Sequence, residues 1–221
     1  MNRRRRGKWH AALLVVALAW LTGCTLGGVG KEGELHYVAP FEHRLSPGET
    51  LPGTEIQYLE KENAGARVRI GGQEALRKVG DSLDWQSEPL DGVAVDWSLR
   101  VVAFSQEDMR VAGTVAITVY DASPVPGEPD TRSNLHYTAP VTLNTRRDQA
   151  IPGTSITYLG SADQGAHLGN VQGYAYRKVA DSITWEGRLK GRLHFRLTTR
   201  VIFHTQSMLQ VAGTASLWIG P

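Results

Sequence analysis

Residues 93–103 read VAVDWSLRVVA, and this stretch decides the fold because its side chains alternate in character. The odd-numbered positions are apolar, while Asp96, Ser98 and Arg100 fall between them. Successive side chains of a β-strand point to opposite faces, so this alternation predicts a strand with one buried and one solvated face. Residues 109–119, which read MRVAGTVAITV, alternate in the same way. The two stretches together predict an antiparallel sheet with one face against a core.

The same pattern returns one hundred residues later. Residues 35–120 align with residues 135–220 without a gap, and 27 of the 86 aligned positions are identical. The shared motifs are Leu-His-Tyr at 35–37 and 135–137, Pro-Gly-Thr at 52–54 and 152–154, and Arg-Lys-Val at 77–79 and 177–179. Similarity over this length indicates that a whole β domain was duplicated.

We therefore expect an all-β protein with two tandem antiparallel β-sandwiches or small barrels, at residues 35–120 and 135–221. Residues 121–134 contain three prolines, which favours a semi-rigid linker between separate domains. One larger barrel closed by both repeats is the alternative. Residues 73–79 are the only short helix candidate after the N-terminal region. Gly113 and Gly213 are expected at a bulge or a close strand contact.

The N-terminus has the organisation of an export signal. Residues 2–8 carry five positive charges, residues 11–21 are apolar, and Leu-Thr-Gly-Cys follows at 21–24. A helix of that apolar length measures about 16 Å, about half of the hydrocarbon thickness of a bilayer, so we interpret residues 1–23 as a signal peptide rather than a membrane span. Leu-Thr-Gly-Cys resembles the lipobox of bacterial lipoproteins.

That resemblance implies cleavage before Cys24, which becomes the lipidated first residue of the exported protein. It implies diacylglycerol on the sulfur, with or without a further acyl chain on the amino group, and an extracytoplasmic protein anchored to a bacterial membrane. More than one acyl chain suits stable attachment. Residues 24–34 are then a glycine-rich tether. Because Cys24 is the only cysteine, no thiol is left for disulfides, metal-thiolate sites or a cysteine nucleophile, and no other cofactor is expected.

The net charge of +2 conceals two opposed halves. The first repeat has 8 basic and 13 acidic residues, and the second has 9 basic and 4 acidic residues. Five cations of the second repeat occupy even-numbered positions and share one face if this segment is extended: Arg188, Lys190, Arg192, Arg196 and Arg200.

This basic stripe is the candidate anion-binding surface. Its expected partners are phospholipid headgroups, an anionic cell-wall polymer or an acidic protein. A solvated outer sheet face, or attraction between the acidic and the basic repeat, would explain the same charges. The export signal argues against nucleic acid as a partner.

The leading hypothesis is a non-enzymatic envelope lipoprotein used for binding or assembly, and a purely structural spacer is a third hypothesis. The alternative from another class is an envelope hydrolase, because His36 and Ser82 recur as His136 and Ser182. No G-x-S-x-G motif accompanies them, and an Asp-Ser pair is typical of a turn.

The histidine spacing is not that of a metal site. Trp218 falls among the polar positions of its strand, so it is expected to be exposed as a carbohydrate or partner contact.

Overall fold

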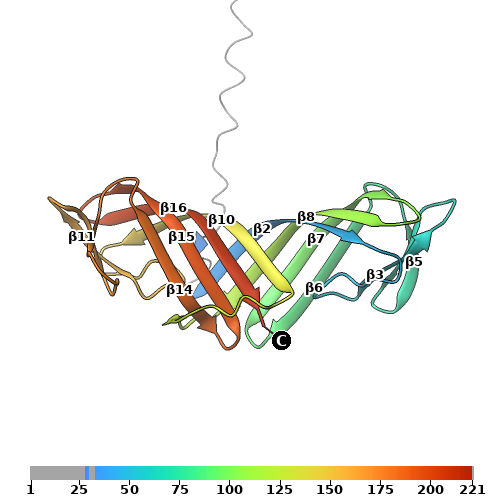
Figure 1. Ribbon diagram of the computed structural model, residues 1–221, viewed down its shortest axis with the longest axis horizontal. Helices are drawn as coiled ribbons and strands as arrows, with labels where there is room; N and C mark the ends of the chain where they lie inside the picture. Colours follow the sequence, from blue (N-terminus) through green and yellow to red (C-terminus); the bar gives the residue numbers. More distant parts are fainter. Residues whose placement is uncertain (1–27, 30–32, 221) are drawn as a thin grey trace, which may run out of the picture.

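The chain is all-β, as the alternation predicts (Figure 1). The computed structural model describes residues 28–29 and 33–220. The expected signal peptide at residues 1–23, the expected lipidation site Cys24 and most of the expected tether lie outside the described residues. All strand pairs are antiparallel, and none of the sheets closes into a barrel, so the alternative of one shared barrel is wrong.

Each repeat, together with a short strand from the segment before it, forms one five-stranded sheet and one three-stranded sheet. In the first repeat the larger sheet has the order β1 (Gly28–Val29), β2 (Glu34–Leu45), β8 (Met109–Tyr120), β7 (Val93–Phe104) and β6 (Ser82–Leu90). The smaller sheet contains β3 (Ile56–Lys61), β4 (Ala66–Ile70) and β5 (Gln73–Arg77).

The second repeat has the same plan. Its larger sheet has the order β10 (Leu135–Arg146), β16 (Met208–Ile219), β15 (Leu193–His204), β14 (Ser182–Lys190) and β9 (Val125–Pro126). Its smaller sheet contains β11 (Thr157–Ala162), β12 (Gly165–Gly169) and β13 (Tyr176–Arg177). The two small sheets lie at the outer ends of the long axis (Figure 1).

Two glycines allow the central strands of each sheet to approach closely. A methyl group on Gly113 would lie 2.0 Å from the carbonyl oxygen of Ser98 on β7. A methyl group on Gly213 would lie 2.1 Å from the carbonyl oxygen of Thr198 on β15. The close strand contact expected at both glycines is confirmed.

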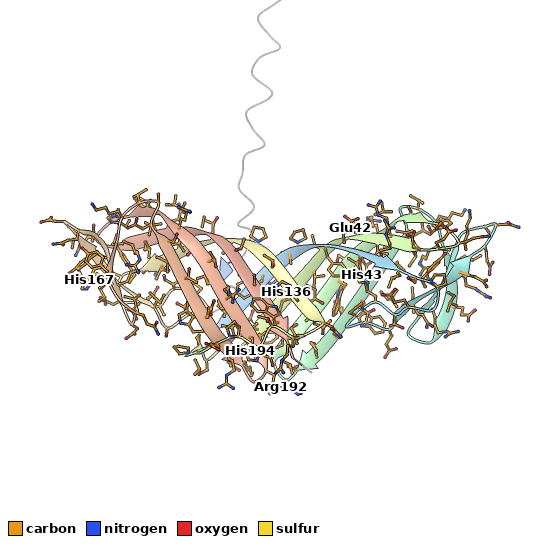
Figure 2. All side chains as sticks on the ribbon, in the orientation of Figure 1. Glu42, His43, His136, His167, Arg192 and His194 are labelled. Atoms are coloured by element: carbon orange, nitrogen blue, oxygen red, sulfur yellow. The ribbon has the colours of Figure 1, made fainter. Side chains whose placement is uncertain are left out.

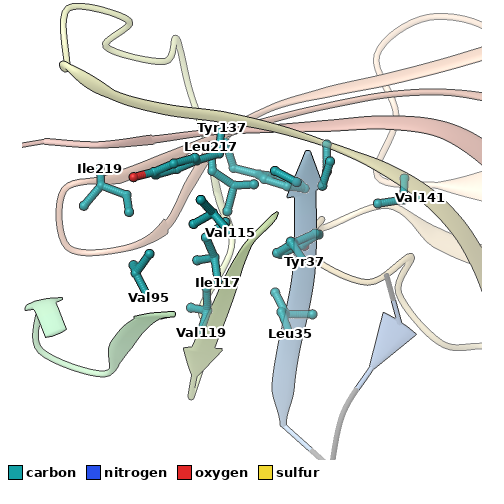
Figure 3. Close-up of a cluster of buried hydrophobic side chains, with 14 of the residues drawn as sticks. Leu35, Tyr37, Val95, Val115, Ile117, Val119, Tyr137, Val141, Leu217 and Ile219 are labelled. Atoms are coloured by element: carbon teal, nitrogen blue, oxygen red, sulfur yellow. The ribbon is translucent and has the colours of Figure 1, made fainter. Parts of the chain in front are cut away.

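Buried side chains from both repeats form one core. Figure 3 shows Tyr37 of β2 in the same cluster as Tyr137 of β10 and Leu217 of β16. The Tyr37 ring lies 5.5 Å from that of Phe195, and the Phe41 ring lies 6.1 Å from that of Tyr137. No hydrogen-bonded ladder joins the repeats within the described ranges, so contacts of side chains, rather than a shared sheet, hold them together.

The repeated motifs meet where the repeats touch. A methyl group on Gly53, from the first Pro-Gly-Thr, would lie 2.8 Å from a methyl carbon of Leu135 in the second Leu-His-Tyr. A methyl group on Gly153 would lie 2.7 Å from the hydroxyl oxygen of Tyr37 in the first Leu-His-Tyr. Each motif therefore packs against the complementary motif of the other repeat, which explains why both motifs recur.

Two local expectations differ from the structure. The short helix candidate at residues 73–79 is wrong, because Gln73–Arg77 pairs with β4 along its whole length as strand β5. The segment expected to be a linker is hydrogen-bonded along the second repeat, where Val125–Pro126 forms the edge strand β9 beside β14. An edge strand tolerates Pro126, which has no N–H to donate to the ladder.

Candidate functional site

The predicted basic stripe lies on the hairpin of β14 and β15. Arg188 is opposite His194 in the ladder, and Arg192 lies in the turn between the two strands (Figure 2). Both arginine side chains are exposed, and neither makes an ion pair with another described residue. These two guanidinium groups are available to an anionic ligand.

The other three cations of the stripe are bonded within the protein. Arg196 donates from Nε to a carboxylate oxygen of Glu186 at 2.6 Å. Lys190 donates from Nζ to the carbonyl oxygen of Tyr120 in the first repeat at 3.1 Å, and Arg200 donates from Nη1 to the carbonyl oxygen of Ala180 at 3.1 Å. The five cations of the stripe are therefore of two kinds: the side chains of Arg188 and Arg192 are unbonded in the described structure, and the other three are engaged within the protein.

Trp218 is buried, so the expectation of an exposed tryptophan is wrong. Its side chain is only 6% exposed. The imidazole of His136 stacks on it at 4.7 Å between ring centroids, and the guanidinium carbon of Arg196 lies 5.5 Å from the ring centroid. Burial lowers the pKa of His136. Alternation placed Trp218 on the outer face correctly, but neighbouring side chains cover that face.

A cavity of about 420 Å³ opens beside this stack, between the segment after β9 and the end of the second repeat. Asp130, Arg132, Arg192 and His194 contribute to its lining. Asp130 accepts two bonds from the Arg132 guanidinium, at 2.9 and 2.8 Å, and this pairing holds the pKa of the Asp130 carboxyl well below its usual range. The backbone N–H of Asp130 donates to Nδ1 of His194 at 3.1 Å. The segment expected to be a linker thus forms one wall of a site.

Sequence reasoning missed this cavity because the contact that forms it is long-range. Asp130 and His194 are 64 residues apart, and no local pattern predicts that they meet. The Asp-x-Arg spacing at 130–132 was the only available signal, and it indicates a local ion pair rather than a site.

A second cavity, of about 550 Å³, lies between the two sheets of the second repeat. Its lining includes Pro126 and Glu128 from the linker segment, and Asn170, Trp185 and Glu186 from the sheets. Trp185 donates from Nε1 to Ser155 Oγ at 3.0 Å, so its indole N–H is satisfied within the protein. The lining is mixed in polarity: it contains two carboxylates, of which Glu186 is bonded to Arg196, and one cation, Arg177.

The Ser/His set of the hydrolase alternative is not assembled within either repeat. His36 is opposite Thr118, which is opposite Ala94 on β7, whereas Ser82 is opposite Arg100 on the same strand. The positions on β7 that mark the two side chains, Ala94 for His36 and Arg100 for Ser82, are six residues apart, which is about 20 Å along the strand. The second repeat has the same register for His136 and Ser182.

A different serine and histidine do meet. Ser161 Oγ lies 2.9 Å from Nδ1 of His204, at the outer end of the second repeat. No ion pair between His204 and a carboxylate occurs among the described residues, so no acid orients the imidazole in the way that a catalytic triad requires. The first repeat has Lys61 and Phe104 at these positions.

Two pairs of polar residues that the repeats share stabilise turns and loops. Asp81 accepts a hydrogen bond from the backbone N–H of Lys78 at 2.8 Å, and Asp181 accepts one from Lys178 at 2.7 Å. The hydroxyls of Tyr58 and Tyr158 donate to the carbonyl oxygens of Ser105 and Thr205. Satisfied local bonds of this kind are a sufficient reason for these residues to recur.

Within residues 28–29 and 33–220 no group of three or more His, Cys, Asp or Glu side chains is placed to hold a metal ion. The same part of the chain contains no helix that is long and apolar enough to cross a membrane. No family model, no curated protein and no solved structure matches this chain.

Proposed function

We propose that the protein is a lipid-anchored component of a bacterial cell envelope that binds an anionic partner through the basic end of its second repeat. Cys24 carries the acyl chains, and the two β repeats form the binding body outside the cytoplasm. The binding surface consists of the exposed guanidinium groups of Arg188 and Arg192 together with the cavity beside Arg132 and His194.

The observation that carries this proposal is the contrast between shared and unshared polar residues. Shared residues such as Asp81 and Tyr58, with their counterparts, are used in local hydrogen bonds. The two exposed arginines of the hairpin belong to one repeat only, since Arg188 and Arg192 replace Glu88 and Gly92. Because the first repeat adopts the same fold without these arginines, they are not needed for the fold, and a binding role accounts for them better.

The chemistry of the surface favours phosphate or carboxylate groups. A guanidinium group presents a planar set of donors that matches both anions with two parallel bonds. The partner that fits best is a polymer of the envelope that carries many such groups, because exposed cations contribute little individually and gain by acting together.

The anchor is tested by metabolic labelling with a fatty-acid probe in a bacterial host. The wild-type protein should incorporate the probe and fractionate with membranes, whereas Cys24→Ser should lose both properties. Equal labelling of the two proteins would overturn the proposed anchor.

The binding surface is tested with inorganic polyphosphate as a soluble polyanion. Arg188→Gln with Arg192→Gln should weaken binding, and added salt should weaken the binding of the wild type, because both change an electrostatic attraction. Arg146→Gln, which removes an exposed cation elsewhere in the same repeat, is the control and should bind like the wild type. Equal weakening by the control would show that net charge, rather than this surface, governs binding.

A further inference from the structure

The two repeats expose the same apolar side chain in the same tight turn. Residues 78–81 form a turn in which the N–H of Asp81 donates to the carbonyl oxygen of Lys78 at 3.1 Å, and residues 178–181 form its counterpart at 3.0 Å. Val79 and Val179 occupy the second position of these turns and are 62% and 58% exposed. Side chains this exposed bury little apolar surface, so core packing does not account for a valine in both repeats.

A second apolar side chain stands beside each valine because of a bulge. The ladder between β7 and β8 shifts register between Val101 and Ala103, which leaves Val102 unpaired. The ladder between β15 and β16 shifts between Val201 and Phe203, which leaves Ile202 unpaired. A bulge redirects the side chain of its extra residue, and Val102 and Ile202 are 41% and 48% exposed.

Backbone hydrogen bonds hold turn and bulge together. The N–H of Gly80 donates to the carbonyl oxygen of Val101 at 2.8 Å, and the N–H of Ala180 donates to that of Val201 at 2.8 Å. We name the two resulting structures the tips. The first tip consists of residues 78–80, 100 and 102, and the second of residues 178–180, 200 and 202.

Each tip carries cations around its apolar centre. Lys78 and Lys178 are exposed and precede the two valines. Arg100 donates from Nη1 to the carbonyl oxygen of Gly80 at 3.0 Å, and Arg200 makes the equivalent bond to Ala180. Arg200, predicted as part of the basic stripe, therefore belongs to the second tip. The one carboxylate of each turn, Asp81 or Asp181, is bound to a backbone N–H.

Both tips lie on one side of the molecule. Strands β6 and β14 begin, and strands β7 and β15 end, along the upper side of the view in Figure 1, while the two hairpins that join them lie along the lower side. The tips are placed at those upper strand ends, because residue 80 bonds to residue 101 and residue 180 bonds to residue 201.

From this arrangement we infer that the two tips form a contact with an anionic phospholipid surface. Exposed valine and isoleucine side chains enter the boundary between headgroups and acyl chains, and the flanking lysines and arginines meet the lipid phosphates. The inference rests on the proposed lipid anchor, which keeps the chain at a membrane. Two tips on the same side can bind one flat surface together, which multiplies a weak contact.

The second tip makes the stronger contact. Phe203, which is exposed, replaces Ala103 next to the bulge. In the neighbouring turn between the last two long strands of each repeat, Ser207 and Met208 replace Glu107 and Asp108, so carboxylates near the first tip are missing near the second. Greater apolar area and fewer anions both favour binding to an anionic bilayer.

The test uses the chain from Thr25 onward, which contains every described residue and carries no lipid, mixed with phosphatidylcholine vesicles with or without phosphatidylglycerol. The wild type should sediment with the anionic vesicles and less with the neutral ones. The double variant Lys78→Gln with Lys178→Gln should bind the anionic vesicles more weakly, by about five-fold per lysine. The double variant Val79→Ser with Val179→Ser should bind them about ten-fold more weakly. Val179→Ser alone should weaken binding more than Val79→Ser alone.

The matched controls are Val125→Ser, which removes an exposed valine outside the tips, and Lys61→Gln, which removes an exposed cation at the end of strand β3, outside the tips and the β14–β15 hairpin. Both should bind anionic vesicles like the wild type. Val102→Ser with Ile202→Ser changes the same tips at other positions and should reproduce the loss, so that a folding defect in one variant cannot decide the result. Absence of vesicle binding, or equal losses in the controls, would overturn the inference. Because the tested chain has no lipid, the result is independent of the labelling of Cys24.

Discussion

The turns at residues 78–81 and 178–181 hold different residues at their third position, but the backbone conformation there is the same. Gly80 has a φ of +92° and Ala180 has a φ of +73°. A left-handed conformation is unstrained for glycine and costs an alanine about 1 kcal/mol. No atom lies within 4 Å of the position that a methyl group on Gly80 would occupy, so backbone strain alone distinguishes the two residues.

Ala180→Gly should therefore raise the free energy of unfolding by about 1 kcal/mol, and Gly80→Ala should lower it by a similar amount. Urea denaturation of the two variants and the wild type measures both changes. Changes of the same sign in the two variants would contradict this account of the turn.

His136 makes the stability of the protein depend on pH. Burial against Trp218 lowers the pKa of its imidazole from the usual value of about 6.5, so the unfolded chain takes up a proton at a higher pH than the folded chain does. The stability that His136 contributes is complete above that value and is lost as the pH falls through the folded pKa. His136→Gln should reduce the loss of stability between about pH 7 and pH 5. An NMR titration that places the pKa of His136 above 6.5 would refute the effect.

At the scale of the elements, alternation predicts strands well where one face is buried and the other is solvated. The strands β7, β8, β15 and β16 follow the pattern of odd apolar positions, and their odd side chains are mostly buried. The pattern fails for β5, because the pairing with β4 decides its structure and its side chains are mostly exposed. It also fails to predict the cover over Trp218, because the covering side chains come from other strands.

The edge strand β9 depends on a single glycine. A methyl group on Gly187 would lie 2.2 Å from the carbonyl oxygen of Val125, so Gly187→Ala should displace β9 from β14. The backbone N–H groups of Ser123 and Gly127, which donate to β14 at 2.8 and 3.1 Å, should then exchange with solvent about ten-fold faster or more. Hydrogen exchange measures this change.

The control for this variant is Ser87→Ala, at the same position of the first repeat. Strand β6 pairs only with β7 in the described structure, so a change at residue 87 has no edge strand to displace. Its amide exchange at Ser123 and Gly127 should match that of the wild type. Retained protection of these amides in Gly187→Ala would contradict the dependence on this glycine.

At the scale of the whole molecule, duplication has produced one body, because the repeated motifs pack across the junction. Gly153 is the sharpest test of that packing. Its φ of +79° is the same as that of Gly173, but a methyl group on Gly153 would meet Tyr37 and Phe195, whereas one on Gly173 would meet no atom within 4 Å. Gly173→Ala should cost about 1 kcal/mol through strain alone.

Gly153→Ala should cost the same strain and about 1–3 kcal/mol more, because the added methyl group overpacks the junction between the repeats. Thermal or urea unfolding of both variants measures the difference. Equal destabilisation by Gly153→Ala and Gly173→Ala would show that the junction accommodates a methyl group and is not tightly packed. The sequence predicts the repeat itself, but it does not predict this junction. A motif that occurs in both repeats could pack within its own repeat or against the other one, and the sequence does not distinguish the two.

The tips and the arginines of the β14–β15 hairpin lie on opposite sides of this body, so the proposed contact of the tips fixes its orientation at a membrane. Cys24 is the only native cysteine and is proposed to carry lipid, so a cysteine introduced at residue 79, 179 or 192 offers a unique site for a nitroxide label. The most direct measurement is the accessibility of each label, on the lipidated protein in anionic vesicles, to oxygen dissolved in the bilayer and to a water-soluble relaxation agent. Labels at residues 79 and 179 should both be accessible to oxygen and shielded from the aqueous agent, and the label at residue 192 should show the reverse. Aqueous exposure of both tip labels, or immersion of residue 192, would contradict the account.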